Sequence, residues 1–519
     1  MEYQNWQDRN ELKVRLLGYC DRGIEEIEEC IRSNRIKPLR MMGGEYTIVY
    51  TIGSSVGIIT SPIGAMQYFY YYDGSSFYHG EEVLDIVKQS GIDWEWDYES
   101  LGDLCDLENL TEKRTLHKKV KRVPPFSVLL YRNELIVFEK DLISTFKERV
   151  TSPTEAVRIL NEETYKWASK SPYISLSGGF DSRVILSSML LNDICPSVVT
   201  VGEEESTDVK VARSITKEYG LEHRVVQLTL DDLINNGEEI ARITNGSKPS
   251  CHWNTYLYPK KASIPKSESF YVGTLGEFAR NYYFDKGIAA MLLDGLPEIV
   301  GYKFWEKKIL RHRTFQEKEL LMLSSSLQQQ LDSNGVVNRA RRNSMLGRGG
   351  FMERGTRYYL EQRVPSFYAN GIKMYNTSGN WRSPFHNVAW LDVIWNLNEK
   401  WKLGSNWHRL AIERNWPGLM EFPEEKGFRK DIMQNKAAPF YWIPVMQRSK
   451  YKTYDLSDKW YKSKKIKEFL IDNSNMISEL VHPNLVESVL REQEERGGRI
   501  KAISFLLTLV YFCLAKSRN

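Results

Sequence analysis

The chain has 519 residues, of which 42% are hydrophobic and 12% aromatic, enough apolar side chains for a folded protein. Its 71 Lys and Arg against 67 Asp and Glu leave a net charge of +4. That balance excludes a disordered chain and a protein that binds nucleic acid through its overall charge. The length exceeds one ordinary core, so we expect two domains, residues 1–148 and 149–519.

The sequence lacks the marks of a secreted or membrane protein. The first residues are polar, unlike a signal peptide. The longest apolar stretch, residues 502–515, is shorter than the roughly 20 residues of a membrane span and favours a buried core helix. Six scattered cysteines without a Cys-x-x-Cys pair predict free thiols, no structural zinc site and a cytoplasmic location.

Residues 1–148 are predicted to be rich in β-strands. A Glu-rich segment, residues 21–35, is helix-like and precedes short β-branched runs at 45–52 and 56–60. A tyrosine-rich run then meets Asp73-Gly74, which is typical of a hairpin turn. A second hairpin is expected around Arg132-Asn133-Glu134.

The pattern changes after residue 150. Ser152-Pro-Thr-Glu is a capping signal for a helix that runs to about residue 170. Strands beginning at Tyr173, Pro196 and His223 then alternate with helices over 183–191 and 208–219. Strands and helices that alternate at this spacing predict a parallel sheet. The remainder of the chain is predicted to be mostly helical.

The loop between the first of these strands and its helix carries the strongest functional signal. Its two glycines let the backbone approach an anion, and Ser177, Ser182 and the first helix amides can donate to phosphate oxygens. Asp181 can hold a magnesium ion there. The loop lacks the residues of a Walker loop and of the dinucleotide fingerprint; the simple alternative is a glycine turn. This phosphate loop consists of Leu176, Ser177, Gly178, Gly179, Phe180, Asp181 and Ser182.

The sequence SGGFDS, placed after a β-rich N-terminal part, resembles the pyrophosphatase loop (PP-loop) of the asparagine synthetase family. The resemblance implies an α/β protein of two domains. The first is a degenerate, glutaminase-like Ntn-type β-sandwich, and the second is a parallel-sheet PP-loop synthetase domain with a helical extension. It also implies that ATP, with Mg²⁺, is cleaved to AMP and pyrophosphate while a carboxylate is adenylated and then attacked by an amine. Relatives include β-lactam synthetase, carbapenam synthetase and the lasso-peptide cyclases.

The same resemblance indicates further ATP contacts. Val201 and Gly202, at the end of the second strand, correspond to the position that contacts adenine in the family. The alternative is an ordinary strand end before an acidic helix start. Residues 270–280 resemble the second phosphate segment, S-G-x-G-x-D-E, with Val272 and Gly273 at its first two positions. Leu275 replaces the second glycine.

Glu277 then falls at the metal-binding acid of that segment, where it is expected to share Mg²⁺ with Asp181. The alternative for Glu277 is a surface carboxylate paired with Arg280. Near residues 423–428 the chain resembles the R-P-K-x-G-F stretch, whose lysine stabilises negative charge as the adenylate forms and reacts. Lys426 is the candidate for that cation, although Arg429 or Lys430 could replace it.

Both positions where relatives keep a proton acceptor are neutral here. Thr274 follows the first glycine of the second phosphate segment, and Asn380 replaces the acid in a segment that resembles E-x-R-x-P-F and retains Arg382. We expect these three residues to handle the substrate. The amine would lose its proton to a nearby carboxylate, to His386 or to the adenylate phosphate; a hydrogen-bonded structural role is the alternative for His386.

The N-terminal part lacks the features of a glutaminase. Relatives that hydrolyse glutamine use a cysteine at the mature N-terminus, whereas the nearest cysteine here is Cys20. The amine is therefore expected from the substrate itself, from a second substrate or through a partner subunit. A basic run over 114–122 is expected to be a solvated face. A second basic tract is either a loop that binds an acidic or peptide substrate or a helix surface, and contains Arg339, Arg341, Arg342, Arg348, Arg354 and Arg357.

These observations predict an ATP-dependent, AMP-forming amide ligase. Intramolecular capture of the adenylate, as in peptide macrolactam or lactam formation, gains from held proximity. A precursor peptide and its protease are then possible partners, and neither a membrane nor nucleic acid is expected. The alternatives are a small-molecule amide synthetase, an ammonia-using amidotransferase, a PP-loop enzyme that modifies tRNA, and an inactive nucleotide-binding partner protein.

Overall fold

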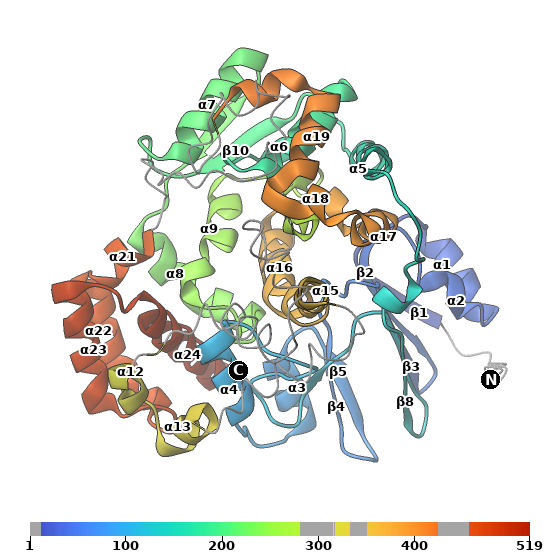
Figure 1. Cartoon of the computed structure of the whole chain (residues 1–519). Helices are drawn as coiled ribbons and strands as arrows, with labels where there is room; N and C mark the ends of the chain where they lie inside the picture. The colour runs from blue at the N-terminus through green and yellow to red at the C-terminus, as the bar shows by residue number, and fades with distance from the viewer. Residues whose placement is uncertain (1–11, 281–314, 316, 333–349, 424–455) are drawn as a thin grey trace.

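The computed structural model describes residues 12–280, 315, 317–332, 350–423 and 456–519. These residues form antiparallel sheets near the N-terminus, a parallel sheet in the middle of the sequence, and helices that follow it (Figure 1). The architecture is α/β, as the sequence predicts. In the view of Figure 1 the N-terminal strands lie at the lower right, the parallel sheet at the top and the C-terminal helices at the lower left.

The N-terminal part contains two antiparallel sheets, with strand orders β1-β2-β3-β7-β8 and β5-β4-β6. Successive residues of β2 face opposite sides, as strand geometry requires. Ile48 packs with Ile27 of α1, whereas Val49 packs with Tyr68 beside the second sheet. The elements are β1 (Leu12–Cys20), α1 (Ile24–Arg32), α2 (Ile36–Leu39), β2 (Gly44–Ile52), β3 (Ser55–Thr60), β4 (Phe69–Tyr72), β5 (Phe77–Gly80), α3 (Val83–Ser90), α4 (Tyr98–Leu107), β6 (Lys121–Arg122), β7 (Ser127–Tyr131) and β8 (Leu135–Glu139).

Both predicted hairpins are confirmed. In the turn between β4 and β5, the Asp73 carboxylate accepts hydrogen bonds from the amides of Ser75 (2.9 Å) and Ser76 (2.8 Å). Strands β7 and β8 pair on either side of the turn that begins at Arg132. The helix predicted over residues 21–35 is shorter, because α1 starts after Gly23 and ends before Ser33.

The parallel sheet has the strand order β11-β10-β9-β12-β13, and all its strands run in the same direction. Strand β9 is central, so the loop that follows it lies in the middle of the carboxyl edge, where open α/β sheets bind ligands. Ser152 caps α5 by accepting from the amide of Thr154, as its capping signal predicts. The elements are α5 (Pro153–Lys166), β9 (Tyr173–Ser175), α6 (Phe180–Leu191), β10 (Ser197–Val201), α7 (Thr207–Tyr219), β11 (His223–Val226), α8 (Leu230–Ile243), β12 (Ser269–Tyr271) and β13 (Asn380–Arg382).

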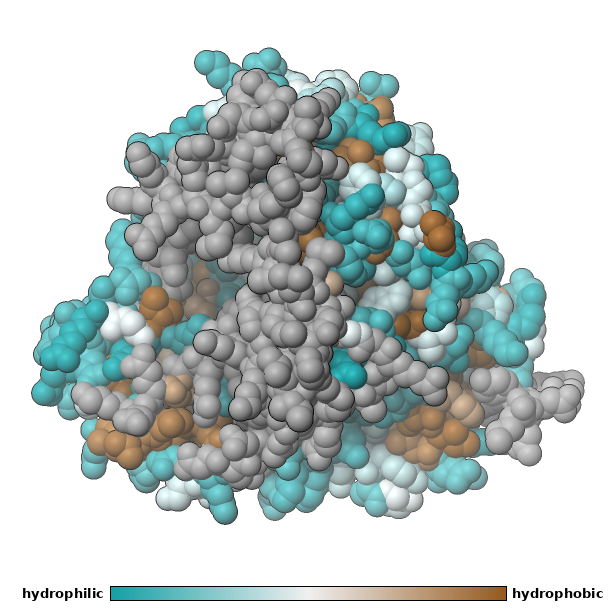
Figure 2. Space-filling view, in the orientation of Figure 1, coloured by the Kyte–Doolittle hydropathy of each residue, from teal (hydrophilic) through white to brown (hydrophobic). Residues whose placement is uncertain are grey.

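The other described elements are mostly helical. The helix α24 has the length and composition of a membrane span, but 72% of its apolar window is buried inside the protein, which confirms the predicted core helix. In Figure 2 the coloured residues at the rim of the view are mostly hydrophilic, and hydrophobic side chains gather at the lower left, where Figure 1 places α12 and α13, and at the lower right, beside the N-terminal strands. These elements are η2 (Ser250–His252), α9 (Asn254–Lys261), η3 (Gly276–Arg280), α12 (Glu317–Met322), α13 (Ser325–Asp332), α15 (Phe351–Tyr358), the π-helix η5 (Tyr359–Tyr368), α16 (Ala369–Ser378), η6 (Pro384–His386), α17 (Val388–Asn396), α18 (Glu399–Lys402), α19 (Asn406–Asn415), η8 (Pro417–Glu421), α21 (Leu456–Tyr461), α22 (Lys464–Asn473), α23 (Pro483–Arg496) and α24 (Ile500–Arg518).

A buried polar contact joins the N-terminal sheet to the part of the chain that follows β13. Glu45 of β2 has no exposed surface, and its Oε2 lies 3.3 Å from Nδ1 of His386 in η6. Its Oε1 accepts from the hydroxyl of Ser61 and from the amide of Ala65 (2.7 Å). His386 therefore has the hydrogen-bonded structural role, which was the alternative to a role as proton acceptor.

We expect Glu45→Ala to lower the free energy of unfolding by about 3–5 kcal/mol, because it leaves His386 and Ser61 buried without their acceptor. Urea unfolding followed by tryptophan fluorescence measures the change. The matched control is Glu28→Ala, which removes only a surface pair with Arg32 (3.9 Å) and should shift the free energy by less than about 1 kcal/mol. Equal shifts for the two variants would contradict the assignment.

Candidate nucleotide-binding site

The phosphate loop lies where the sequence places it, between β9 and the N-terminus of α6. The amide of Leu176 donates to the carbonyl of Val199 (3.0 Å) and fixes the start of the loop to the sheet. The amide of Ser177 donates to Oγ of Ser182 (3.2 Å), and the amide of Gly179 donates to Oγ of Ser177 (3.2 Å). These bonds hold the two hydroxyls 3.3 Å apart, so both predicted phosphate donors lie in one turn.

A carboxylate from the next helix orients this turn. Oδ1 of Asp208, in the first turn of α7, accepts from the amide of Gly178 (2.6 Å). Burial raises the pKa of Asp208, while the bond from Gly178 lowers it. In the sequence, Asp208 is only the last residue of an acidic helix start. Asp208 begins the helix that follows β10, and β10 pairs with β9. This position was the sequence signal that could have placed Asp208 at the loop.

The two predicted metal-binding carboxylates come together at one end of the loop. Burial raises the pKa of Glu277, the nearby charge of Asp181 raises it further, and Arg280 lowers it. Arg280 Nη2 lies 2.7 Å from Oδ2 of Asp181, and His408 Nε2 lies 2.9 Å from Oδ1. Glu277 is only 7% exposed, so it is not the surface carboxylate of the alternative interpretation.

The residues present fit a magnesium ion. Proteins hold Mg²⁺ through one or two carboxylates together with substrate phosphates. Asp181 and Glu277 supply two carboxylates that repel each other in a buried place, and a cation shared between them would relieve that repulsion. Asp181 and Glu277 are therefore the residues that would hold the ion.

The second phosphate segment approaches the loop more closely than any side chain would allow. A Cβ at Gly273 would lie 2.9 Å from Cβ of Asp181 and 3.3 Å from the amide nitrogen of Ser182, and a Cβ at Gly276 would lie 2.9 Å from Cβ of Asp181. Leu275, which stands in place of the family's second glycine, has φ of 74°, a left-handed conformation that glycine adopts without cost. Leu275 thus adopts a backbone conformation that favours glycine.

The predicted adenine contacts lie at the end of β10, and the start of the second phosphate segment lies at the end of β12, so the two flank β9. Val201 ends β10, and the amide of Gly202 donates to the carbonyl of Val226 (3.1 Å). A Cβ at Gly202 would lie 2.6 Å from Oγ of Ser206, so the turn into α7 requires glycine. On the other side, the amide of Val272 donates to the carbonyl of Arg382 (3.1 Å). The structure therefore brings both strand ends to the same edge as the loop.

The three predicted substrate residues lie at the ends of β12 and β13. The carbonyl of Thr274 accepts from the hydroxyl of Ser383 (2.8 Å). Arg382 donates to Oδ1 of Asn380 (2.7 Å), and its guanidinium lies 3.9 Å from the ring centre of Tyr19 in β1. Arg382 thereby stacks on the N-terminal sheet, and its contact with a substrate stays a prediction.

Arg183 is a site residue that sequence analysis missed. This residue of α6 is fully buried and donates to the carbonyl of Gly178 in the phosphate loop (3.0 Å). It also donates to the carbonyls of Phe422 (3.0 Å) and Pro423 (2.8 Å), which follow η8. Arg183 thus fixes the loop to the chain immediately before residue 424. An arginine among apolar helix residues was its only signal in the sequence.

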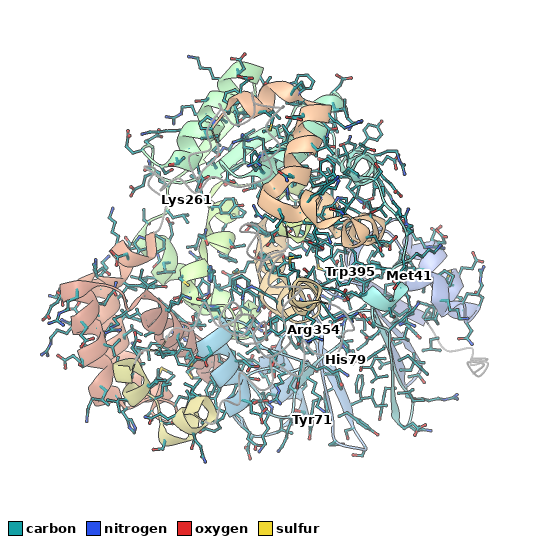
Figure 3. All side chains as sticks on the ribbon, viewed as in Figure 1. Met41, Tyr71, His79, Lys261, Arg354 and Trp395 are labelled. Carbon is teal, nitrogen blue, oxygen red and sulfur yellow. The ribbon has the colours of Figure 1, made fainter. Side chains whose placement is uncertain are left out.

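Some predicted residues lie outside the described part of the chain. These are Lys426 with its alternatives Arg429 and Lys430, and four arginines of the second basic tract, namely 339, 341, 342 and 348. Arg354 lies near the centre of the view in Figure 3, in α15. Arg357 of the same helix pairs with Asp141 (3.1 Å) and Glu361 (2.9 Å), which favours the helix-surface alternative for this end of the tract.

Comparison with known proteins agrees with this geometry over part of the chain. Residues 169–263, from just before β9 to just after α9, match the family model described as asparagine synthase. No curated protein matches the chain. The matched segment contains the phosphate loop, supports a relationship to the asparagine synthetase family and indicates an ATP-dependent, amide-forming ligase in general.

We expect Gly273→Ala to weaken ATP binding, because the added methyl would push the turn that follows β12 away from Asp181 and the start of α6. Overpacking of this kind costs about 1–3 kcal/mol, or a five- to 150-fold rise in Kd measured by titration calorimetry with ATP and Mg²⁺. Gly23→Ala is the control, since a Cβ at Gly23 meets no atom within 4 Å. Unchanged affinity in Gly273→Ala would place the nucleotide elsewhere.

Proposed function

We propose that the protein activates a carboxylate with ATP and joins it to an amine. The observation that carries the proposal is the contact of Gly273 and Gly276 with Asp181. This contact brings the two phosphate segments together at the carboxyl edge of a parallel sheet whose first part matches the asparagine synthase model.

In the first step, a carboxylate oxygen attacks the α-phosphorus of ATP, the bond to the bridging oxygen of the β-phosphate breaks, and pyrophosphate leaves. Ser177, Ser182 and the amides of the phosphate loop hold the departing phosphates, aided by the N-terminus of α6. Mg²⁺, when bound, neutralises charge on those phosphates. Arg280 is placed to exchange its bond with Asp181 (2.7 Å) for one with a phosphate oxygen.

In the second step, the amine attacks the acyl carbon, loses a proton, and AMP leaves. We propose that the same substrate carries the amine, so that the product is a peptide macrolactam or a lactam. An amine on the bound substrate is already close to the acyl carbon, so no second molecule has to bind. The neutral Thr274 and Asn380 support a proton acceptor different from those of the relatives. A small-molecule amide synthetase, or an enzyme that uses free ammonia, is the second candidate and shares the first step.

The N-terminal sheets act in this proposal as a scaffold. Glu45 orients His386, and Tyr19 supports Arg382, so each contact fixes a residue that follows or ends β13. Lys426 is proposed as the cation that stabilises charge on the reacting acyl phosphate. The proposed partners are a precursor peptide and its protease.

We expect Asp181→Asn to lower the rate of pyrophosphate release from ATP by about 100-fold or more, because the loop loses a carboxylate beside the leaving group. The assay follows AMP and pyrophosphate with a panel of peptides that carry a free amine and a side-chain carboxylate. The control is Asp193→Asn, an exposed residue with φ of 57° after α6, a conformation that asparagine tolerates.

The outcome separates the competing functions. Release of ADP and phosphate would contradict adenylation. Binding of ATP without turnover for any carboxylate and amine would favour the inactive nucleotide-binding protein. AMP formation that requires an added amine or ammonia would favour the second candidate over intramolecular capture.

A further inference from the structure

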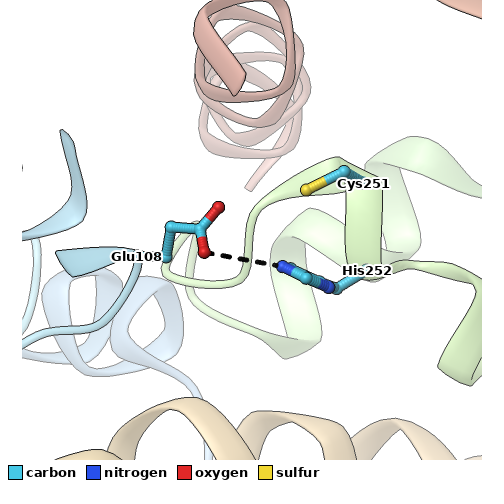
Figure 4. Close-up of side chains that lie close together, drawn as sticks. All are labelled: Glu108, Cys251 and His252. Carbon is cyan, nitrogen blue, oxygen red and sulfur yellow. Dashed lines mark ion pairs between the residues drawn. The ribbon is translucent and has the colours of Figure 1, made fainter. Parts of the chain in front are cut away.

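A group of metal-ligating side chains lies far along the chain from the phosphate loop. Glu108, Cys251 and His252 each offer a ligand atom, and these three atoms lie within 4.8 Å of one another. Figure 4 shows the thiol and the imidazole turned toward the carboxylate. The absence of a Cys-x-x-Cys pair predicted no structural zinc site, because two of these three ligands are adjacent residues and the third lies more than 140 positions earlier.

The carboxylate of Glu108 and the imidazole of His252 face each other as an ion pair with room between them. His252 Nε2 lies 3.9 Å from Oε2 of Glu108, beyond hydrogen-bonding distance. The same nitrogen is buried and has no hydrogen-bond partner among the described residues. Two atoms that each bind a tetrahedral zinc ion at about 2.0–2.2 Å are about 3.4 Å apart, so a shift of about half an ångström would let both contact one ion.

Rigid elements hold each ligand in place. Glu108 follows α4 with φ of 57°, and its side chain is 6% exposed. The amide of Cys251 donates to Oγ of Ser504 in α24 (2.9 Å), and the ring of His252 lies edge-on to Phe367, with 5.0 Å between ring centres. Preorganised ligands of this kind reduce the cost of binding an ion.

Two neighbouring lysines are compatible with a bound metal because neither donates to the Glu108 oxygen that faces His252. Lys501 Nζ lies 3.3 Å from Oε1 of Glu108, the oxygen that does not face His252. A hydrogen bond to the second oxygen is the usual support of a carboxylate ligand. Lys248 Nζ donates to the carbonyl of Phe367 (3.0 Å).

We propose that Glu108, Cys251 and His252 bind a zinc ion that joins the N-terminal part of the chain to the synthetase part. Thiolate, imidazole and carboxylate are all zinc ligands, and three protein ligands leave the fourth position for water. Glu108 belongs to the first part, at the end of α4, and the other two ligands belong to η2, which packs on α24. The ion is structural in this proposal and takes no part in the reaction with ATP.

The test measures zinc itself and does not depend on enzymatic activity. The full-length protein is dialysed with ZnCl₂, freed of excess metal, and analysed by inductively coupled plasma mass spectrometry. We expect about one zinc per chain. Replacement by Co²⁺ should give the thiolate-to-cobalt charge-transfer absorption that reports a cysteine ligand.

Three variants decide which residues bind. Cys251→Ser and Glu108→Gln should each weaken zinc binding by more than about 100-fold, since even supporting residues around a metal contribute 10- to 100-fold. Cys195→Ser, which removes an exposed cysteine elsewhere, should bind zinc as the natural chain does. Circular dichroism confirms that each variant is folded.

Two outcomes would overturn the proposal. One is wild-type protein with far less than one zinc per chain and no thiolate-to-cobalt absorption. The other is equal zinc content in Cys251→Ser and Cys195→Ser, which would show adventitious binding only. Loss of zinc from Cys251→Ser with unchanged pyrophosphate release would support a structural ion, and failure of pyrophosphate release in wild-type protein would leave the zinc result unaffected.

Discussion

The candidate site depends on one close backbone contact, between the start of α6 and the turn that follows β12. Gly273 and Gly276 have no side chain, and a Cβ on either would lie 2.9 Å from Cβ of Asp181. The contact brings Asp181 next to Glu277, and it sets the two phosphate segments side by side. Enzymes catalyse phosphoryl transfer mainly by positioning the reacting groups and by stabilising charge. A loop that binds phosphates would therefore depend on this contact.

Several buried polar residues maintain that placement. Arg183 binds the carbonyl of Gly178, Asp208 binds its amide, and His408 lies against both Asp181 and the carbonyl of Gly276 (3.1 Å). Each is costly to bury without a partner. Their presence shows that the loop is held from several elements, namely α6, α7 and α19.

The local features of the fold were predictable from the sequence, and the long-range features were not. The hairpin at Asp73, the cap at Ser152 and the loop at Ser177 each depend on a few adjacent residues whose preferences are strong. The stacking of Arg382 on Tyr19 and the pairing of Glu45 with His386 join residues more than 300 positions apart, and no local pattern reports such contacts. Leu275 shows a third case, in which tertiary packing imposes a left-handed backbone that its residue type disfavours.

The hydrophobic core has a consequence for how this protein can evolve. One continuous cluster of buried side chains contains Tyr19, Trp96 and Leu104 from the first part of the chain and Ile174, Trp381 and Phe512 from the second. Loss of the N-terminal part would therefore uncover the apolar surfaces against which the rest of the chain packs. Substitutions are tolerated where the N-terminal part faces water, whereas residues of the shared core stay constrained in size and polarity.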